Sequence, residues 1–210
     1  MNIKKLITRL SSRYGQIGWK GFVFGFLEKI RNYLLKIYFR FDGWHVGATY
    51  HFRPYKAQVV EVVNQLCPIS VVELGCGLGD ILSRINSSLK YGIDIDPGVI
   101  RAARFINKKG CDFFCADLLY SDVHLDLNID RVDCVIMVNF THNLTFKQIN
   151  KLINRVSENV TLKYIVIDII KPGFGYKYSH SIAELKGVGQ VIEVFEGLDC
   201  IRNFVLLRLN

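Results

Sequence analysis

The stretch Val71-Val72-Glu73-Leu74-Gly75-Cys76-Gly77-Leu78-Gly79-Asp80 decides the fold of this chain of 210 residues. Its apolar start is typical of a buried strand, and its three glycines predict a sharp turn that opens a helix over about 79–87. Because glycine has no Cβ, such a turn lets backbone N–H groups come close to a bound ligand. Many nucleotide-binding folds contain a turn of this kind. Here, however, Asp80 stands where a dinucleotide fingerprint has its third glycine.

Acidic residues accompany both of the first two predicted strands. Glu73 lies inside the first strand, and Asp94 follows Gly75 by 19 residues at the end of the run Tyr91-Gly92-Ile93-Asp94. A ribose-binding carboxylate is expected at about this distance, because a carboxylate accepts two hydrogen bonds from a diol. Asp96 precedes Pro97, a pair typical of the N-cap and first residue of a helix. The sequence therefore favours Asp94 for a ribose, with Asp96 as second choice.

Strands and helices alternate along the rest of the chain. Continuous apolar runs such as 132–138 indicate a parallel sheet that is covered on both faces. The last two runs are separated by six residues only, 196–201, a gap too short for a helical crossover, which predicts an antiparallel hairpin. The predicted strands are 69–74, 90–95, 111–116, 132–138, 162–170, 188–195 and 202–209, and the predicted helices are 3–12, 22–40, 55–66, 79–87, 97–109 and 145–158. The stretch 118–131 is predicted to be mostly loop, and 41–55 to be irregular.

Together, the glycine turn, its acids and the terminal hairpin resemble class I S-adenosylmethionine (SAM)-dependent methyltransferases. The resemblance implies an α/β fold, a Rossmann-like seven-stranded methyltransferase sheet of order 3-2-1-4-5-7-6 with strand 7 antiparallel, here with an N-terminal helical extension. It implies SAM as cofactor and no metal. The residues expected to bind SAM are Glu73, Gly75, Cys76, Gly77, Gly79, Asp94, Ile95, Asp117 and Asn139. In the family, the glycines surround the amino-acid part of the cofactor, with help from Glu73, and Asp117 matches the position that accepts from the adenine amino group.

The fourth strand ends in Asn139-Phe140-Thr141-His142-Asn143, where the family places the methyl acceptor. A hydroxyl acceptor needs a base, and His142 is the candidate because its ordinary pKa lies near neutrality. His180, His45 and His51 are competitors for this role. The chain lacks the Asn/Asp-Pro-Pro-aromatic motif that many amino-group methyltransferases of nucleic acids carry after strand 4. This favours transfer to oxygen over transfer to a base amino group.

The positive charge of the chain is concentrated at its N-terminus. Residues 1–40 hold nine of the 27 basic residues and one of the 19 acidic ones, so the remaining chain has 18 of each. We expect a basic, aromatic-rich helical extension over 1–54, which could fold over the cofactor as a lid, and a SAM-binding domain over 55–210. The basic helices suit an anionic membrane surface. Packing against another subunit and a grip on nucleic acid are the alternatives.

The chain shows no signal peptide and no run long enough to span a membrane. Its six cysteines form neither a CxxC pair nor zinc-type spacing, which favours free thiols in a reducing compartment. The sequence predicts a cytoplasmic enzyme, peripheral at the inner face of the membrane, that methylates a small-molecule or glycan-linked acceptor, resembling methyltransferases of bacterial surface-glycan biosynthesis. An RNA methyltransferase that uses the basic arm and a non-catalytic SAM-binding scaffold are the alternatives.

Overall fold

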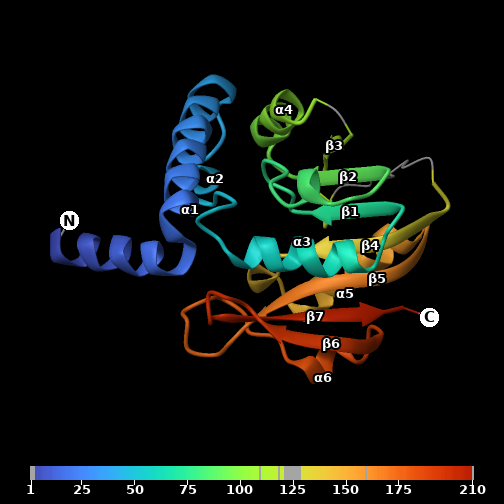
Figure 1. Cartoon of the computed structure of the whole chain (residues 1–210). Coiled ribbons are helices and arrows are strands. Elements are labelled where there is room, and N and C mark those ends of the chain that lie inside the picture. Colours follow the sequence, from blue (N-terminus) through green and yellow to red (C-terminus); the bar gives the residue numbers. More distant parts are fainter. Residues whose placement is uncertain (1–2, 109, 118, 121–128, 159, 210) are drawn as a thin grey trace.

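A seven-stranded sheet runs through the computed structural model of this chain, which describes residues 3–108, 110–117, 119–120, 129–158 and 160–209 (Figure 1). The strands are β1 (Ser70–Leu74), β2 (Leu89–Asp94), β3 (Asp112–Cys115), β4 (Arg131–Met137), β5 (Thr161–Ile170), β6 (Gln190–Glu196) and β7 (Arg202–Arg208). Their order is β3-β2-β1-β4-β5-β7-β6. The first five strands are parallel, and β7 is antiparallel to both β5 and β6. The predicted fold class is confirmed.

Two helical layers cover the sheet because its strands are apolar on both faces. On one face, Val72, Val135 and Ile165 belong to a core cluster with α5 (Phe146–Ser157) and α6 (Ile182–Leu185). On the other face, the alternate residues Val71 and Cys134 join a cluster with α3 (Tyr55–Gln65) and α4 (Pro97–Ile106). The strict alternation follows from the two-residue period of a strand.

The predicted helices at 55–66, 97–109 and 145–158 are confirmed within a few residues, but the helix at 79–87 is wrong. A single 3-10 turn, η1 (Leu82–Arg84), stands there. Leu82 in this turn and Ile81 and Ile85 on either side of it are buried. The Ser87 hydroxyl then donates to the Ile69 carbonyl and leads the chain into β2. Most of the predicted loop at 118–131 lies outside the described residues.

The N-terminal extension consists of two helical pieces that meet at a kink at Gly18, as the sequence predicts, and both pieces extend closer to the kink than the predicted 3–12 and 22–40 (Figure 1). Helix α1 (Ile3–Phe39) continues through Gly15 and Gly21, and only Gly18 leaves helical geometry, with φ 65° and ψ 175°. A short helix, α2 (Trp44–Gly47), follows within the segment predicted to be irregular. Leu35 and Phe41 pack with Val99 and Ala102 of α4. The extension therefore shares a core with the domain behind it, and a boundary at residue 54 stays a prediction.

Candidate functional site

A cavity of about 300 Å³ lies at the carboxyl ends of β1, β2 and β4. This is where open parallel sheets bind ligands, at the point where strand order reverses. Among the predicted cofactor residues, those that line the cavity are Glu73, Gly75, Cys76, Gly77, Asp94, Ile95, Asp117 and Asn139. The two predicted site residues Gly79 and His142 are described but are not part of its lining. Residues from the extension and α3 close the cavity: Trp44, His45, Ala48, Tyr55 and Lys56.

The glycine turn forms a cradle that side chains would fill. Gly75 has φ +67°, and a Cβ there would lie 2.8 Å from the Phe140 ring. Gly77 has φ +54°, and a Cβ there would lie 3.1 Å from Nδ1 of His45. Both positions require a backbone that residues with side chains rarely adopt. Side chains at these two positions would collide with Phe140 and His45, which line the same cavity, so the turn borders the cavity as bare backbone, and the residues present fit SAM.

The Asp94 carboxylate holds the glycine turn from the neighbouring strand. Its Oδ2 accepts from the Gly77 amide at 2.9 Å, and its Oδ1 accepts from the Asp96 amide at 3.1 Å. Each carboxylate oxygen has two lone pairs, so acceptor capacity remains toward the cavity. Asp96 caps α4 instead, since its side chain accepts from Gly98 and Val99. The Asp94 carboxylate thus borders the cavity, and the Asp96 carboxylate caps the helix.

Glu73 is a buried carboxyl group at the base of the cavity. Burial raises its pKa to about 8, with smaller contributions from Asp80 and Asp94, against the lowering effect of Lys56 and of the hydrogen bond from the Leu82 amide. A carboxyl group with this pKa is largely protonated at neutral pH. A cationic group that enters the cavity would favour its charged form.

Glu73→Gln should flatten the pH dependence of stability. Because the native pKa of Glu73 lies above its ordinary value of 4.5, the unfolded chain loses this proton first. The free energy of unfolding should therefore fall as pH rises from about 4.5 to about 8, at most by about 1.4 kcal/mol per pH unit, and then level off. Urea unfolding at a series of pH values measures this slope. The exposed Glu61→Gln is the matched control and should keep the wild-type slope. Parallel curves for Glu73→Gln and wild type would refute the assignment.

Asp117 serves its own loop and also borders the cavity. Its Oδ1 accepts from the Leu119 and Tyr120 amides at 3.0 and 3.3 Å. The loop-capping role is therefore present, whether or not a ligand also uses the carboxylate. Ile95 lies beside it with 62% of its surface exposed. An apolar surface and a carboxylate at this end of the cavity suit the flat face and amino edge of a nucleobase.

Behind Asn139 lies a buried charged cluster that sequence reasoning missed. Asn139 has φ 73°, and its amide donates to Asp168 at 3.0 Å. Arg202 donates from Nη1 to Asp168 at 2.5 Å and from Nε to Asp199 at 2.7 Å, and its guanidinium lies 4.2 Å from the centre of the Tyr55 ring. Asp168 and Arg202 are completely buried. The available signal was a charge inside each of two apolar runs, the later strands β5 and β7, which pair antiparallel in the sheet.

The four candidate histidines have different surroundings. His45 lines the cavity. His51 pairs with Glu28 at 2.9 Å, and Nε2 of His180 lies within hydrogen-bond distance of the Thr141 and Leu144 carbonyls. His142 lies in η2 (Thr141–Asn143), just beyond the lining residues Asn139 and Phe140. Each of these side chains except His142 thus has a polar partner or faces the cavity.

The His142 ring is buried against Tyr176, with ring centres 4.5 Å apart. Its Nδ1 has no hydrogen-bond partner among the described residues. Burial lowers its pKa, with Arg202 acting in the same direction and Asp168 opposing it. This imidazole is therefore neutral at pH 7 and able to accept a proton.

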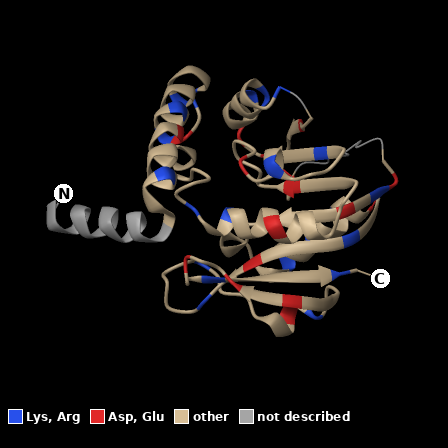
Figure 2. Cartoon of the chain, viewed as in Figure 1, with Lys and Arg blue, Asp and Glu red and all other residues tan. Residues whose placement is uncertain are grey.

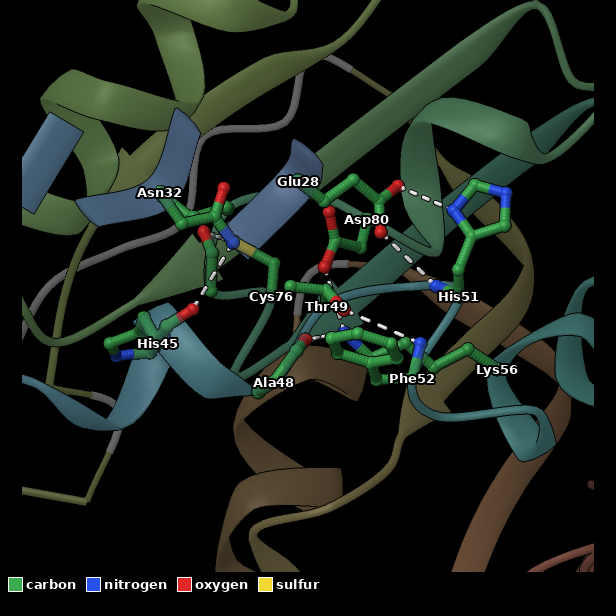
Figure 3. A network of polar contacts seen from close by, with 12 residues as sticks. Glu28, Asn32, His45, Ala48, Thr49, His51, Phe52, Lys56, Cys76 and Asp80 are labelled. Carbon is green, nitrogen blue, oxygen red and sulfur yellow. Dashed lines mark hydrogen bonds and ion pairs between the residues drawn. The ribbon is translucent and has the colours of Figure 1, made fainter. Parts of the chain in front are cut away.

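Lys56 and Asp80 join the extension to the glycine turn. Lys56 Nζ donates to Asp80 at 2.8 Å and also to the Ala48 carbonyl, while Asn32 of α1 donates to the His45 carbonyl (Figure 3). Burial acts to raise the pKa of Asp80, but Lys56, Arg31 and Arg84 outweigh it and lower that pKa. Asp80 is therefore charged, and this ion pair fixes the wall formed by residues 44–56.

Comparisons with known proteins agree with this geometry. Residues 71–161 match a family model described as methyltransferase domain. A protein named as a methyltransferase, Rv1506c of Mycobacterium tuberculosis, is 38% identical over 63 residues, which are 27% of this chain and 38% of that relative. The match therefore spans well under half of the relative's length.

Two solved structures share the fold. The N-methyltransferase NodS from Bradyrhizobium japonicum WM9, in complex with S-adenosyl-L-homocysteine, has a TM-score of 0.61 and 14% identity over 86% of this chain and 98% of that one. Magnesium protoporphyrin IX methyltransferase (ChlM) from Synechocystis PCC 6803, also with this product bound, has a TM-score of 0.59 and 14% identity over 85% of this chain and 95% of that one. At such identities the likeness establishes the fold alone.

Proposed function

We propose that this chain, a class I SAM-dependent methyltransferase, transfers the methyl group to a hydroxyl of a small-molecule or glycan-linked acceptor. The observation that carries the proposal is a neutral, buried imidazole, His142, next to the Asn139 end of the cavity. Transfer to a hydroxyl requires removal of a proton, whereas in-line displacement at a sulfonium needs little beyond alignment. In this proposal residues 1–54 form the extension and 55–210 the catalytic domain.

The chain's own residues divide the work of binding. Bound SAM supplies an electrophilic methyl group. Glu73 and the backbone of Gly75, Cys76, Gly77 and Gly79 hold the amino-acid part of SAM. Asp94 accepts hydrogen bonds from the ribose. Ile95, Asp117 and Asn139 lie beside the adenine base and the methyl group. The support is that all of these except Gly79 border one cavity. Gly79 acts indirectly, because a Cβ there would lie 2.8 Å from the Phe113 ring.

His142 holds the acceptor's proton in this proposal, and His45 contacts the cofactor side. His142→Gln should lower kcat by about 10²- to 10⁴-fold, the range for loss of a general base, and leave the Kd for SAM unchanged. His45→Ala should instead raise the Kd for SAM and leave kcat unchanged, because the His45 ring borders Gly77. Steady-state kinetics and calorimetry with SAM separate the two effects. Equal kcat values for wild type and His142→Gln, in a variant with an unchanged melting temperature, would remove His142 from the reaction.

The acceptor class can be tested without knowing the acceptor. The enzyme is incubated with SAM that carries a tritiated methyl group, in separate reactions that contain a glycolipid extract, nucleotide sugars or RNA as the acceptor. We expect label in a sugar-containing product that survives mild alkali, because a methyl ether resists it whereas a methyl ester releases methanol. Label in RNA, with binding that falls steeply with salt, would favour the RNA alternative. Absence of S-adenosylhomocysteine with every acceptor would favour the non-catalytic scaffold.

An anionic membrane as binding partner belongs to the same proposal. Residues 1–40 contact an anionic membrane surface, and the enzyme works in the cytoplasm at the inner face of the membrane. Among the described residues, no helix combines the length and apolar character of a membrane span. The support for a peripheral contact is the basic charge of the extension together with its aromatic side chains.

A further inference from the structure

The second half of α1 has a buried face and an exposed apolar face on opposite sides of the helix. The inner face is buried: Gly25 packs on the Phe52 ring, where a Cβ would lie at 2.6 Å, and Asn32 and Leu35 are buried. The outer face repeats every three or four residues and is exposed to 45–61% along its length: Trp19, Val23, Phe26, Ile30, Tyr33 and Ile37. Leu27 and Leu34 widen it, at 54% and 60%. Such a contiguous apolar surface on a folded chain marks an interaction site.

Basic side chains border this outer face on both sides. Lysines at 29 and 36 follow one edge, and Lys20 lies at the other. Figure 2 shows several basic positions on this half of α1 and a single acidic one. That acid, Glu28, belongs to the inner face, where it contacts His51 (Figure 3) and lies 3.4 Å from Arg84. The exposed surface of this half of α1 is therefore apolar in the middle and cationic at its edges.

We propose that this outer face, Trp19 to Ile37 of α1, lies flat in the surface of an anionic lipid bilayer. The inference rests on the proposed function. It places the membrane contact on one face of α1 and gives the side chains of that face separate roles. Trp19 and Tyr33 suit the headgroup level, the aliphatic residues enter the acyl boundary, and the lysines meet lipid phosphates. A second copy is a poorer occupant, because face-to-face packing brings lysines against lysines with no acid to pair them.

The inner face of the same helix holds the wall of the cavity. Arg31 lies 3.8 Å from Asp80, Asn32 donates to the His45 carbonyl at 3.3 Å, and Arg84 reaches Glu28 at 3.4 Å. Helix α1 therefore carries the bilayer contact on one side and the cavity wall on the other. A docked enzyme would hold its cavity at a fixed distance and orientation relative to the lipid headgroups. An acceptor that is anchored in the bilayer suits this geometry.

Vesicle sedimentation of the full-length protein tests the docking surface. Phosphatidylserine-containing vesicles should bind it, and phosphatidylcholine vesicles should bind it far less. The outer-face variant Phe26→Ser/Ile30→Ser/Tyr33→Ser and the edge variant Lys29→Glu/Lys36→Glu should each weaken partitioning by about tenfold or more. Ile192→Ser on β6, where Ile192 is 47% exposed, is the matched control and should bind as wild type does. The variants should keep the wild-type Kd for SAM, which shows that the cavity is intact.

The outcomes separate the docking proposal from the proposed function. Equal sedimentation of wild type and the outer-face variant would overturn the docking surface while leaving methyl transfer untouched. Light scattering that shows a dimer, abolished by the outer-face variant, with no vesicle binding would assign the face to a second copy. Salt-sensitive RNA binding that depends on these lysines, with no vesicle binding, would likewise overturn the proposal.

Discussion

Asp168→Ala should lower the free energy of unfolding by about 3–5 kcal/mol, the range for removal of one partner of a buried ion pair. Asp168 and Arg202 are both completely inaccessible to solvent, and Nη1 of Arg202 donates to Asp168 at 2.5 Å. Without Asp168, Asp199 is the one carboxylate that the structure describes beside the Arg202 charge, and the Asn139 amide and the Thr141 hydroxyl each lose a partner. Urea unfolding measures the loss.

Two variants keep this prediction falsifiable. Lys171→Ala removes a surface pair with Glu196 on the neighbouring part of the fold and should cost at most about 1 kcal/mol. The double variant Asp168→Leu/Arg202→Met should be more stable than Asp168→Ala, because it also removes the completely buried Arg202 charge. Asp199, which then loses Arg202, is partly exposed and still accepts from the Ile201 amide at 3.3 Å. A loss for Asp168→Ala no larger than that for Lys171→Ala would show that the pair contributes little.

Asp94→Ala should weaken SAM binding by about 1–3 kcal/mol, the range for hydrogen bonds to a charged group. The substitution removes the carboxylate that borders the cavity and also the acceptor that holds the Gly77 amide. Calorimetry with SAM measures the change. NAD is the comparison ligand, since NAD binding without SAM binding would contradict the assignment of the site.

Asp96→Ala is the matched control, two residues further along the chain. Asp96 accepts from the Gly98 and Val99 amides at the start of α4 and does not border the cavity. Its loss should cost about 1 kcal/mol of stability, as for other N-caps, and leave the Kd for SAM unchanged. If instead Asp96→Ala weakened SAM binding and Asp94→Ala did not, the ribose would belong to Asp96.

The sheet could be predicted from the sequence because its signals are local and repeated. Apolar runs, the glycine turn and the short gap before the last strand each indicate one element, and parallel pairing follows from the helices between strands. The cavity residues at strand ends could be placed for the same reason, since the carboxyl ends of parallel strands meet at one edge. The prediction of a helix at 79–87 failed because the backbone is already extended at Ile85, with φ −73° and ψ 135°, so that a single 3-10 turn forms before β2.

The rest of the site could not be predicted, because it depends on contacts between distant segments. In the sequence, nothing distinguishes Lys56 from an ordinary lysine on a helix. Its ion pair with Asp80, 24 residues later, depends on the fold. His45 lines the cavity, and its carbonyl accepts from Asn32 of α1, 13 residues earlier in the chain. His142, the candidate base in sequence, lies next to the cavity but does not line it, since the chain turns inward after Asn139.

The bonds of Glu28 make the extension and the sheet one cooperative unit. Glu28 accepts from the His51 amide at 3.1 Å, pairs with the His51 ring and meets Arg84 just before β2. A truncated chain that begins after α1 would leave His51 and Arg84 without this carboxylate and would strip the covering from residues 44–56. Removing the extension would therefore also remove contacts around the cavity wall, so side-chain substitutions on the outer face of α1 test the proposed membrane contact more cleanly than truncation does.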